Sequence, residues 1–251
     1  MVKIAILIPS TSKKRNWKNY KESDFFKITL SSFLKTMDKE HTYTFFIGYD
    51  EDDAFFLNKR TQLEFQQSVE PPITIEFYQF PKSNGNVVYI WNELFKKAFY
   101  SDVKYDYFHQ TGDDIEYMDK GWTNECITEI KKMGDVGVVG HTDWGRRQYN
   151  SKDCLLTQSF VGRSHYEMLG YYFHPYLRNW YCDNYITDLY CSAGRFKQIE
   201  HRIQNKGGEP RYEIHRAGEL EKECVISDLP KIPYYMEIKK RQELLRLSFN
   251  I

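Results

Sequence analysis

Short apolar runs alternate with stretches of helical periodicity along the first 140 residues of the chain. The runs are rich in aromatic and β-branched residues and end in polar turns, which is typical of strands buried on both faces of a sheet. They cover residues 3–9, 42–49, 73–80, 105–110 and 136–139. This alternation predicts an α/β fold with a mostly parallel sheet flanked by helices, and ligands of such sheets lie beyond the carboxyl ends of the strands.

The helical stretches repeat apolar residues every three or four positions. They are clearest over 26–37, 86–100 and 122–133, each long enough to cover one face of a sheet. After residue 140 the pattern weakens. We expect a polar, irregular segment over 141–153, a helical region rich in Tyr and Trp around 176–194, and a charged outer helix over 237–247.

The balance of charge excludes several classes of partner. Lys and Arg number 35 and Asp and Glu also number 35, so no overall field attracts nucleic acid or an anionic membrane. The apolar run at 4–9 is far shorter than the ~20 residues that span a bilayer. Five cysteines, without a C-x-x-C pair, favour reduced thiols. We therefore expect a cytoplasmic protein without a membrane span or a nucleic-acid partner.

Two adjacent carboxylates follow the predicted strand 105–110, in the turn Gly112-Asp113-Asp114. Carboxylate oxygens are ligands that Mg²⁺ and Mn²⁺ prefer, and the glycine allows a phosphate to approach the backbone. Because neighbouring side chains of an extended segment face opposite sides, we expect Asp114 to bind the metal directly and Asp113 to lie nearer a ribose or a metal-bound water. An ordinary Asp-Asp turn is the alternative.

Four segments follow one another in the order and spacing of a known family: KIAILIPST, FFIGYDEDD, YFHQTGDDIEYMDKGW and GYYFHPYLRNWYCDNYITDLYCSAGR. Together they resemble the GT-A fold, and specifically the family 2 type glycosyltransferases, over residues 3–201. Small glycosyltransferases of large DNA viruses have a similar plan. The resemblance implies one Rossmann-like domain over 1–251, with a nucleotide-binding half at about 1–115, an acceptor half at about 116–220 and a helical tail at about 221–251.

The same resemblance implies an activity. A sugar passes from a nucleoside diphosphate sugar to a hydroxyl of a glycan or glycoprotein, with Mn²⁺ or Mg²⁺ as the cofactor and with inversion at the anomeric carbon. UDP is the preferred carrier, with GDP or dTDP as alternatives. For the donor the resemblance implies the strand tips, with Lys82, Asn86 and Thr111 added as further candidates: Pro9, Ser10, Thr11, Asp50, Asp52, Lys82, Asn86, Thr111 and Asp113.

In inverting members of that family an aspartate ahead of a helix removes the proton of the acceptor hydroxyl. The matching segment here is 180–184, with Asp183 in the position of the base and Cys182 where a second acid often stands. A carboxylate suits this role because the hydroxyl becomes acidic only as it bonds to the anomeric carbon. The alternative interpretation makes Asp183 a helix N-cap.

The remaining candidates serve the metal and the acceptor. The resemblance implies a late histidine as third metal ligand, for which His201 is preferred to His215. In the loop HTDWGRR over 141–147, the Trp144 indole suits stacking on a sugar ring, and Arg146 and Arg147 suit a phosphate or a carboxylate.

Three other classes of protein compete with this interpretation. A Gly-Asp-Asp turn after a strand also occurs in the palm of RNA polymerases, but 251 residues do not hold fingers, palm and thumb. A nucleotide- or carbohydrate-binding module without catalysis needs no base at Asp183. A nicotinamide dehydrogenase is a weaker alternative still, because no G-x-G-x-x-G follows the first strand.

Overall fold

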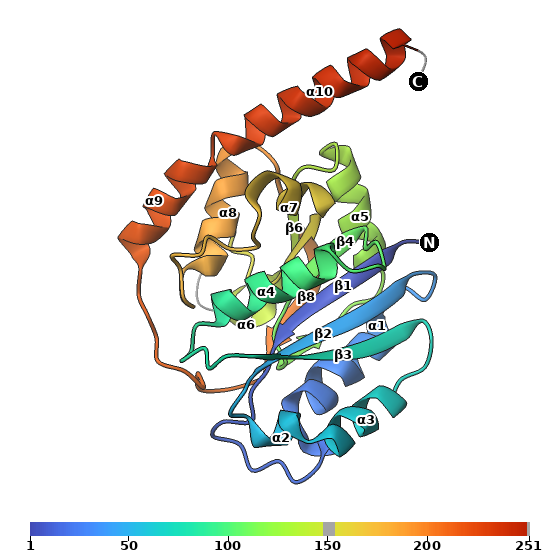
Figure 1. Cartoon of the computed structure of the whole chain (residues 1–251), viewed down its shortest axis with the longest axis vertical. Helices are drawn as coiled ribbons and strands as arrows, with labels where there is room; N and C mark the ends of the chain where they lie inside the picture. The colour runs from blue at the N-terminus through green and yellow to red at the C-terminus, as the bar shows by residue number, and fades with distance from the viewer. Residues whose placement is uncertain (148–153, 250–251) are drawn as a thin grey trace.

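The computed structural model describes residues 1–147 and 154–249, and within them eight strands form one mixed sheet (Figure 1). The order across the sheet is β3-β2-β1-β4-β7-β6-β8-β5. The neighbours from β3 to β4 are parallel, β7 is antiparallel to β4 and β6, β8 is parallel to β6, and β5 is antiparallel to β8. The strands are β1 (Lys3–Pro9), β2 (Thr42–Asp50), β3 (Ile73–Phe80), β4 (Tyr107–Gln110), β5 (Ile115–Tyr117), β6 (Val138–Asp143), β7 (Ser159–Gly162) and β8 (Phe196–Asn205).

Helices cover both faces of the sheet. The face that carries α4 also packs against α7 and α8, and the opposite face packs against η2, α1, α3 and α5. The helical elements are η1 (Tyr20–Glu22), η2 (Phe25–Leu30), α1 (Ser31–Thr36), α2 (Ala54–Leu57), α3 (Lys59–Gln67), α4 (Val87–Phe99), α5 (Trp122–Lys132), α6 (Trp144–Arg147), α7 (Arg163–Leu169), α8 (Cys182–Ser192), α9 (Gly218–Asp228) and α10 (Lys231–Phe249).

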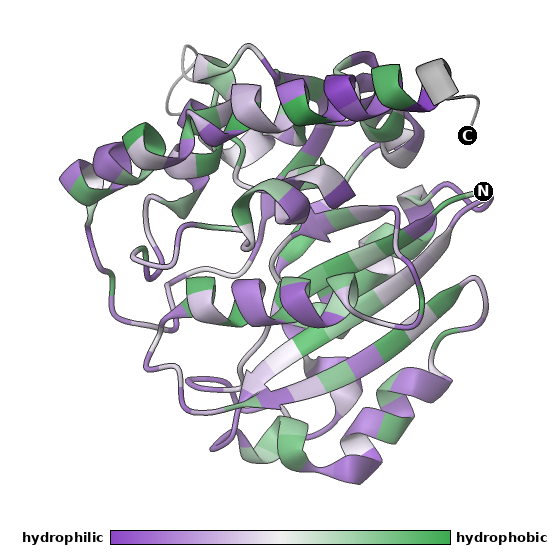
Figure 2. Ribbon diagram, turned by 45° about the horizontal axis from the view of Figure 1, so that its top comes forward, coloured by the Kyte–Doolittle hydropathy of each residue, from purple (hydrophilic) through white to green (hydrophobic). Residues whose placement is uncertain are grey.

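The sheet separates two hydrophobic cores, and β1 shows how the sequence builds both. Ile4, Ile6 and Ile8 face the core under α1, whereas Ala5 and Leu7 face the core under α4. Strict alternation of side chains along a strand explains why such a strand is apolar at every position. In Figure 2 the central strand β1 accordingly carries a continuous green, hydrophobic stretch, whereas the edge strand β3 mixes hydrophobic and polar residues.

The predicted elements of the first half are confirmed with shifts of a few residues at their ends. Part of the expected irregular segment 141–153 differs: residues 141–143 complete β6 and 144–147 form α6, and residues 148–153 lie outside the described residues. The polar strand β8 was not predicted, because only Ile199 and Ile203 of its ten residues are buried and the others carry no apolar pattern. The expected division into a nucleotide half, an acceptor half and a tail stays a prediction.

The last two helices differ from the rest in position. Both α9 and α10 lie along one side of the molecule, and α10 extends past the sheet (Figure 1). Asp228 at the end of α9 is buried and accepts hydrogen bonds from the hydroxyls of Tyr171 and Tyr185, while Lys231 lies 2.8 Å from it. These contacts fasten the start of α10 to α8 and its surroundings. In the part of the chain described, no helix has the length and apolar character needed to cross a bilayer.

Candidate active site

A cavity of about 1470 Å³ opens at the carboxyl ends of the parallel strands. Its walls include the tips of β1, β2 and β4, the amino-terminal ends of α4 and α8, and the segment 205–213 that follows β8. The predicted position of the site is therefore where the structure has its cavity, as expected for an open α/β sheet. Of the predicted residues, the following line it: Pro9, Ser10, Thr11, Asp50, Lys82, Asp113, Asp114 and Asp183.

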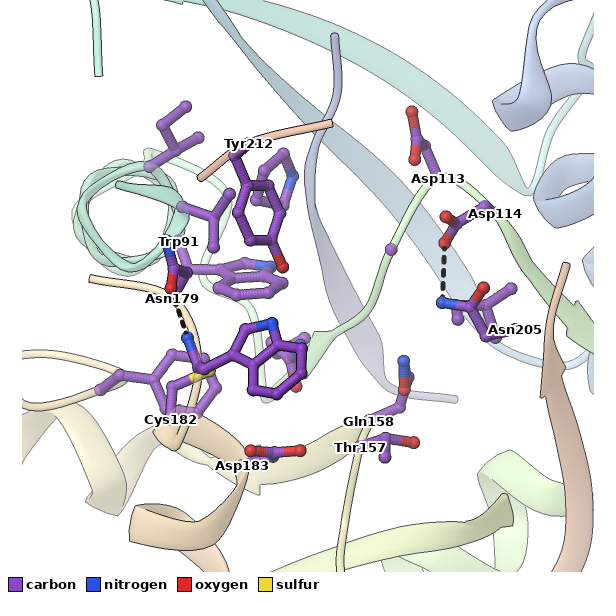
Figure 3. A pocket seen from close by; sticks show the side chains of 18 of the residues that line it. Trp91, Asp113, Asp114, Thr157, Gln158, Asn179, Cys182, Asp183, Asn205 and Tyr212 are labelled. Atoms are coloured by element: carbon purple, nitrogen blue, oxygen red, sulfur yellow. Dashed lines mark hydrogen bonds between the residues drawn. The ribbon is translucent and has the colours of Figure 1, made fainter. Parts of the chain in front are cut away.

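The acidic turn after β4 forms one wall. Asp113 is almost fully buried and its Oδ2 accepts a hydrogen bond of 2.6 Å from Ser10 Oγ at the tip of β1. Asp114 is more open, and its Oδ1 lies 3.5 Å from Asn205 Nδ2 (Figure 3). The two neighbouring side chains thus point to different sides, as expected for an extended segment: Asp113 faces β1, and Asp114 faces the end of β8.

A cation that the sequence did not reveal lies between these carboxylates. Arg211 donates hydrogen bonds to both carboxylate oxygens of Asp113, and its NH2 atom lies 3.8 Å from Asp114 Oδ2. It also donates to the carbonyl of Thr11 at 2.8 Å. The guanidinium is 11% exposed, so this is a buried ion pair of the kind that costs much when one partner is removed.

The negative charge at this wall exceeds what Arg211 neutralises. Burial, together with the charge of Asp113, raises the pKa of Asp114 to about 7, although Arg211 acts in the opposite direction. Three carboxylates, those of Asp24, Asp113 and Asp114, lie within 4.0 Å of Arg211. A further positive charge would therefore be stabilised here.

Carboxylates and lysines meet at the tip of β2. Asp50 is buried, and its carboxylate lies 2.9 Å from Lys13 Nζ and accepts a hydrogen bond from the backbone of Ser83. Asp52 lies 3.1 Å from the ammonium groups of both Lys13 and Lys82. These ion pairs join the loops after β1, β2 and β3. They offer paired acceptors and two lysines to a polar ligand at this end of the cavity.

Asp53 is a structural residue of the site that the sequence analysis did not single out. Its carboxylate accepts hydrogen bonds from Thr11 Oγ1 and from the backbone and hydroxyl of Ser12. It also caps α2 through the backbone N–H of Phe56. Asp53 therefore ties the loop after β1 to the loop after β2. In the sequence, the position of Asp53 directly before the apolar residues 54–56 is the signal that could have identified it as a helix cap.

Asp183 lies on the wall opposite the acidic turn (Figure 3). It stands in the first turn of α8, where a carboxylate is favoured by the helix dipole, and its Oδ1 accepts the backbone N–H of Asn184. The N-cap position belongs to Tyr181, whose φ of 71° is left-handed. Asp183 is thus the second residue of α8, and Tyr181 holds the N-cap position that was the alternative role for Asp183.

Several predicted residues lie outside the cavity lining. Thr111 is fully buried and its Oγ1 accepts a hydrogen bond from Tyr117. Asn86 caps α4 through the backbone of Tyr89. Trp144 lies against Arg202. Asp52 contributes to the cavity only through its two lysine partners. The side chains of Arg146 and Arg147 fall outside the described residues.

The two histidines considered as metal ligands are placed elsewhere. His201 Nε2 lies 2.8 Å from the carbonyl of Lys120, and Nδ1 lies 2.9 Å from Glu125. Its neighbour Glu200 lines the cavity, so alternation along β8 turns His201 to the opposite face. His215 is held through its backbone N–H by Asn179. Neither histidine is among the described residues that line the cavity.

The acidic turn nevertheless fits a divalent cation. Over residues 1–147 and 154–249, no three His, Cys, Asp or Glu side chains converge as a complete metal shell. Asp113 and Asp114 supply hard oxygen ligands, and Arg211 already stands as a cation beside both. Two protein ligands leave positions for oxygens of a bound diphosphate, which is how Mg²⁺ is commonly held.

Comparison with known proteins defines the class of fold. No protein-family model and no curated protein sequence matches this chain. Its structure is similar to solved glycosyltransferases. For S. aureus TarS 1–349 in complex with UDP the TM-score is 0.56 at 12% identity, over 90% of this chain and 65% of that chain. For S. aureus TarS the TM-score is 0.55 at 13% identity, over 81% and 36%.

GalNAc-T7, solved with UDP, GalNAc and Mn²⁺, has a TM-score of 0.59 at 8% identity, over 84% of this chain and 46% of that chain. The chain thus spans between about a third and two thirds of the length of these proteins. Identities this low establish the fold alone. The chain has the GT-A fold of glycosyltransferases, as the sequence predicted.

Proposed function

We propose that this protein is a metal-assisted glycosyltransferase that moves a sugar from a nucleoside diphosphate sugar to a hydroxyl of a glycan or glycoprotein, with inversion. One observation carries the proposal: a single cavity has the Asp113–Asp114 turn and the strand tips on one wall and Asp183 on the other. The two solved neighbours that hold UDP support a donor of this class. UDP is the preferred carrier, with GDP and dTDP as alternatives.

The donor half of the cavity supplies groups for each part of a nucleotide sugar. Asp50, with the backbone at Pro9 to Thr11, offers acceptors and donors to the base and ribose. Lys13, Lys82 and Arg211 offer positive charge to the diphosphate. Asp113 and Asp114 would hold Mn²⁺ or Mg²⁺, which when bound supplies Lewis-acid stabilisation of the leaving diphosphate.

The transfer itself is a single displacement. The acceptor oxygen forms a bond to the anomeric carbon, the bond between that carbon and the diphosphate oxygen breaks, and its electron pair stays on the diphosphate. The acceptor proton passes to the carboxylate of Asp183. Attack from the Asp183 side, opposite the wall that holds the diphosphate, inverts the anomeric configuration.

The proposal extends to features expected from the sequence, two by resemblance and the location from the cysteines. Membership of the family 2 type, the likeness to small glycosyltransferases of large DNA viruses and a cytoplasmic location stay predictions.

A binding screen tests the donor assignment. Purified protein is heated with UDP, GDP and dTDP sugars, each with and without Mn²⁺. A ligand at 100 times its Kd stabilises the folded state by about 2.7 kcal/mol, so the correct donor raises Tm measurably. Stabilisation by one nucleotide class, accompanied by slow donor hydrolysis, is the expected result. Equal Tm values with every donor in the presence of Mn²⁺ would contradict the proposal.

A further inference from the structure

Arg211 occupies the position in which a metal ion would meet the acidic turn. Its guanidinium contacts both oxygens of Asp113 and approaches Asp114 Oδ2 to 3.8 Å. Asp113 Oδ2 also accepts the hydroxyl of Ser10. Both carboxylate oxygens of Asp113 are therefore engaged by donors of this chain, and a divalent ion that binds this carboxylate must displace or share the contact with Arg211.

The segment that carries Arg211 is anchored on both sides of it. Before Arg211, the backbone N–H of Lys206 donates to the carbonyl of Asp114, and the carbonyl of Gly207 accepts a hydrogen bond from Arg15. After it, Asn179 binds the carbonyl of Glu213 and the N–H of His215. The segment thus forms part of the cavity wall and continues to α9 (Figure 1), with Arg211 directed at the acidic turn.

Phosphate oxygens are a second kind of group that the Arg211 guanidinium can bind in the cavity. Arg binds phosphate groups by two parallel hydrogen bonds, as it binds carboxylates. A donor diphosphate beside the acidic turn brings such oxygens to the cavity that Arg211 already lines. The geometry therefore allows the guanidinium to exchange Asp113 for a phosphate without leaving the site.

We propose that Arg211 competes with a divalent cation for Asp113 and Asp114, and that the donor diphosphate ends this competition by binding the guanidinium, so that metal and donor bind together. The inference rests on the proposed function for the identity of the donor. Linkage makes the effect reciprocal: a nucleotide that raises the affinity for the metal is itself bound more tightly when the metal is present. Free metal alone occupies the site poorly.

The experiment measures Mn²⁺ binding directly, by calorimetry and by the electron paramagnetic resonance signal of free Mn²⁺. In the unaltered protein, Mn²⁺ alone binds weakly and UDP raises its affinity about ten-fold or more, within the usual range of coupling between sites. In Arg211→Met, which keeps an unbranched apolar stem and removes the guanidinium with its charge, Mn²⁺ alone binds about ten-fold more tightly than in the unaltered protein. UDP still offers its diphosphate oxygens to the metal, so it raises the Mn²⁺ affinity of Arg211→Met, but by a smaller factor than in the unaltered protein.

A matched control removes the same charge from the same segment. Lys206 pairs with Glu116 at 3.3 Å on the surface and does not contact the carboxylate of Asp113 or Asp114. Lys206→Met is expected to bind Mn²⁺ as the unaltered protein does. An equal gain of Mn²⁺ affinity in Lys206→Met and Arg211→Met would show a general charge effect and would overturn the inference.

Loss of Arg211 leaves Asp113 buried without its partner, so the folding of the variant is measured as well. Arg211→Met is expected to have a lower Tm than the unaltered protein and to recover more of it on addition of Mn²⁺. If the variant does not fold without metal, Arg211→Lys, which keeps one charge but not the bidentate contact, replaces it and is expected to bind Mn²⁺ with intermediate affinity.

Two outcomes separate this inference from the proposed function. The first outcome is measured without nucleotide. If Arg211→Met, or Arg211→Lys where that variant replaces it, binds Mn²⁺ with the same affinity as the unaltered protein, the proposed competition is overturned, whatever the transferase assay shows. Absence of nucleotide binding in every protein contradicts the proposed function, while tighter binding of Mn²⁺ alone by Arg211→Met still establishes the competition.

Discussion

The hydroxyl of Ser10 donates a hydrogen bond of 2.6 Å to Asp113, and this contact fixes the tip of β1 to the acidic turn after β4. The two residues are separated by 103 positions in the chain and both are buried. The parallel pairing of β1 with β4 brings them together, since the register that sets Leu7 against Gln110 places the ends of both strands at one edge. The candidate site is therefore built on the centre of the sheet.

Replacement of Ser10 by Ala tests this contact. The change leaves a buried carboxylate with one hydrogen bond fewer, and bonds to charged groups contribute about 1.5–3 kcal/mol. We expect the free energy of unfolding to fall by this amount in urea denaturation, together with weaker binding of UDP and Mn²⁺. Ser101→Ala, in the turn before β4, is the control. Unfolding free energies that agree for Ser10→Ala and the unaltered protein would contradict the described contact.

Gly207 allows the segment after β8 to cover Asp114. A Cβ atom at this position would lie 1.7 Å from Asp114 Oδ2, so Gly207→Ala must displace either the carboxylate or the segment. We expect Mn²⁺ binding in the presence of UDP to weaken about ten-fold, since Asp114 is a proposed metal ligand. Glu209→Ala, an exposed change in the same segment, serves as control. Retention of full Mn²⁺ affinity in Gly207→Ala would show that Asp114 does not bind the metal.

His141 predicts a dependence of stability on pH. Its side chain is buried, neither ring nitrogen has a hydrogen-bond partner among the residues that the structure describes, and its ring centroid lies 4.9 Å from that of Trp122. Burial, and next the neighbouring His109, lower the pKa of His141 well below its ordinary value of 6.5. As pH falls below 6.5, His141 binds a proton in the unfolded chain but stays neutral in the folded chain. The free energy of unfolding therefore decreases as pH falls below 6.5.

The variant His141→Phe removes this group and keeps a ring in its place. In urea denaturation between pH 7 and pH 5, we expect the decline in unfolding free energy to become shallower, by up to about 1.4 kcal/mol per pH unit. Buried His109 and His165, whose pKa values burial lowers to about 4, maintain the remaining slope. An unchanged slope in His141→Phe would mean that His141 is accessible to protons in the folded protein.

Sequence patterns located the strand tips because apolar strands end abruptly in polar turns. Asp50, Asp113 and Asp114 could be predicted together since parallel strands present their carboxyl ends at one edge. Asp183 needed the family resemblance, because its position relative to the sheet depends on how α8 packs. These four residues lie around one cavity in the structure.

Arg211 could not be predicted from the same patterns. It belongs to a polar segment without periodicity, 98 residues after Asp113, and its contact depends on the course of the chain after β8. The preference for His201 had a related weakness. On a strand that was not recognised, the face of each side chain is unknown, and a shift of one residue separates Glu200 in the cavity from His201 on the other face.

The central claim is that the cavity joins a donor site to a base at Asp183, and Asp183→Asn tests it most directly. Turnover with saturating nucleotide sugar and acceptor is compared with UDP affinity in the unaltered protein, in Asp183→Asn and in Asp102→Asn, an exposed control in the turn before β4. Loss of a general base lowers the rate about 10²–10⁴-fold, so we expect transfer by Asp183→Asn to fall by that factor with unchanged UDP affinity. Transfer at the unaltered rate would contradict the account.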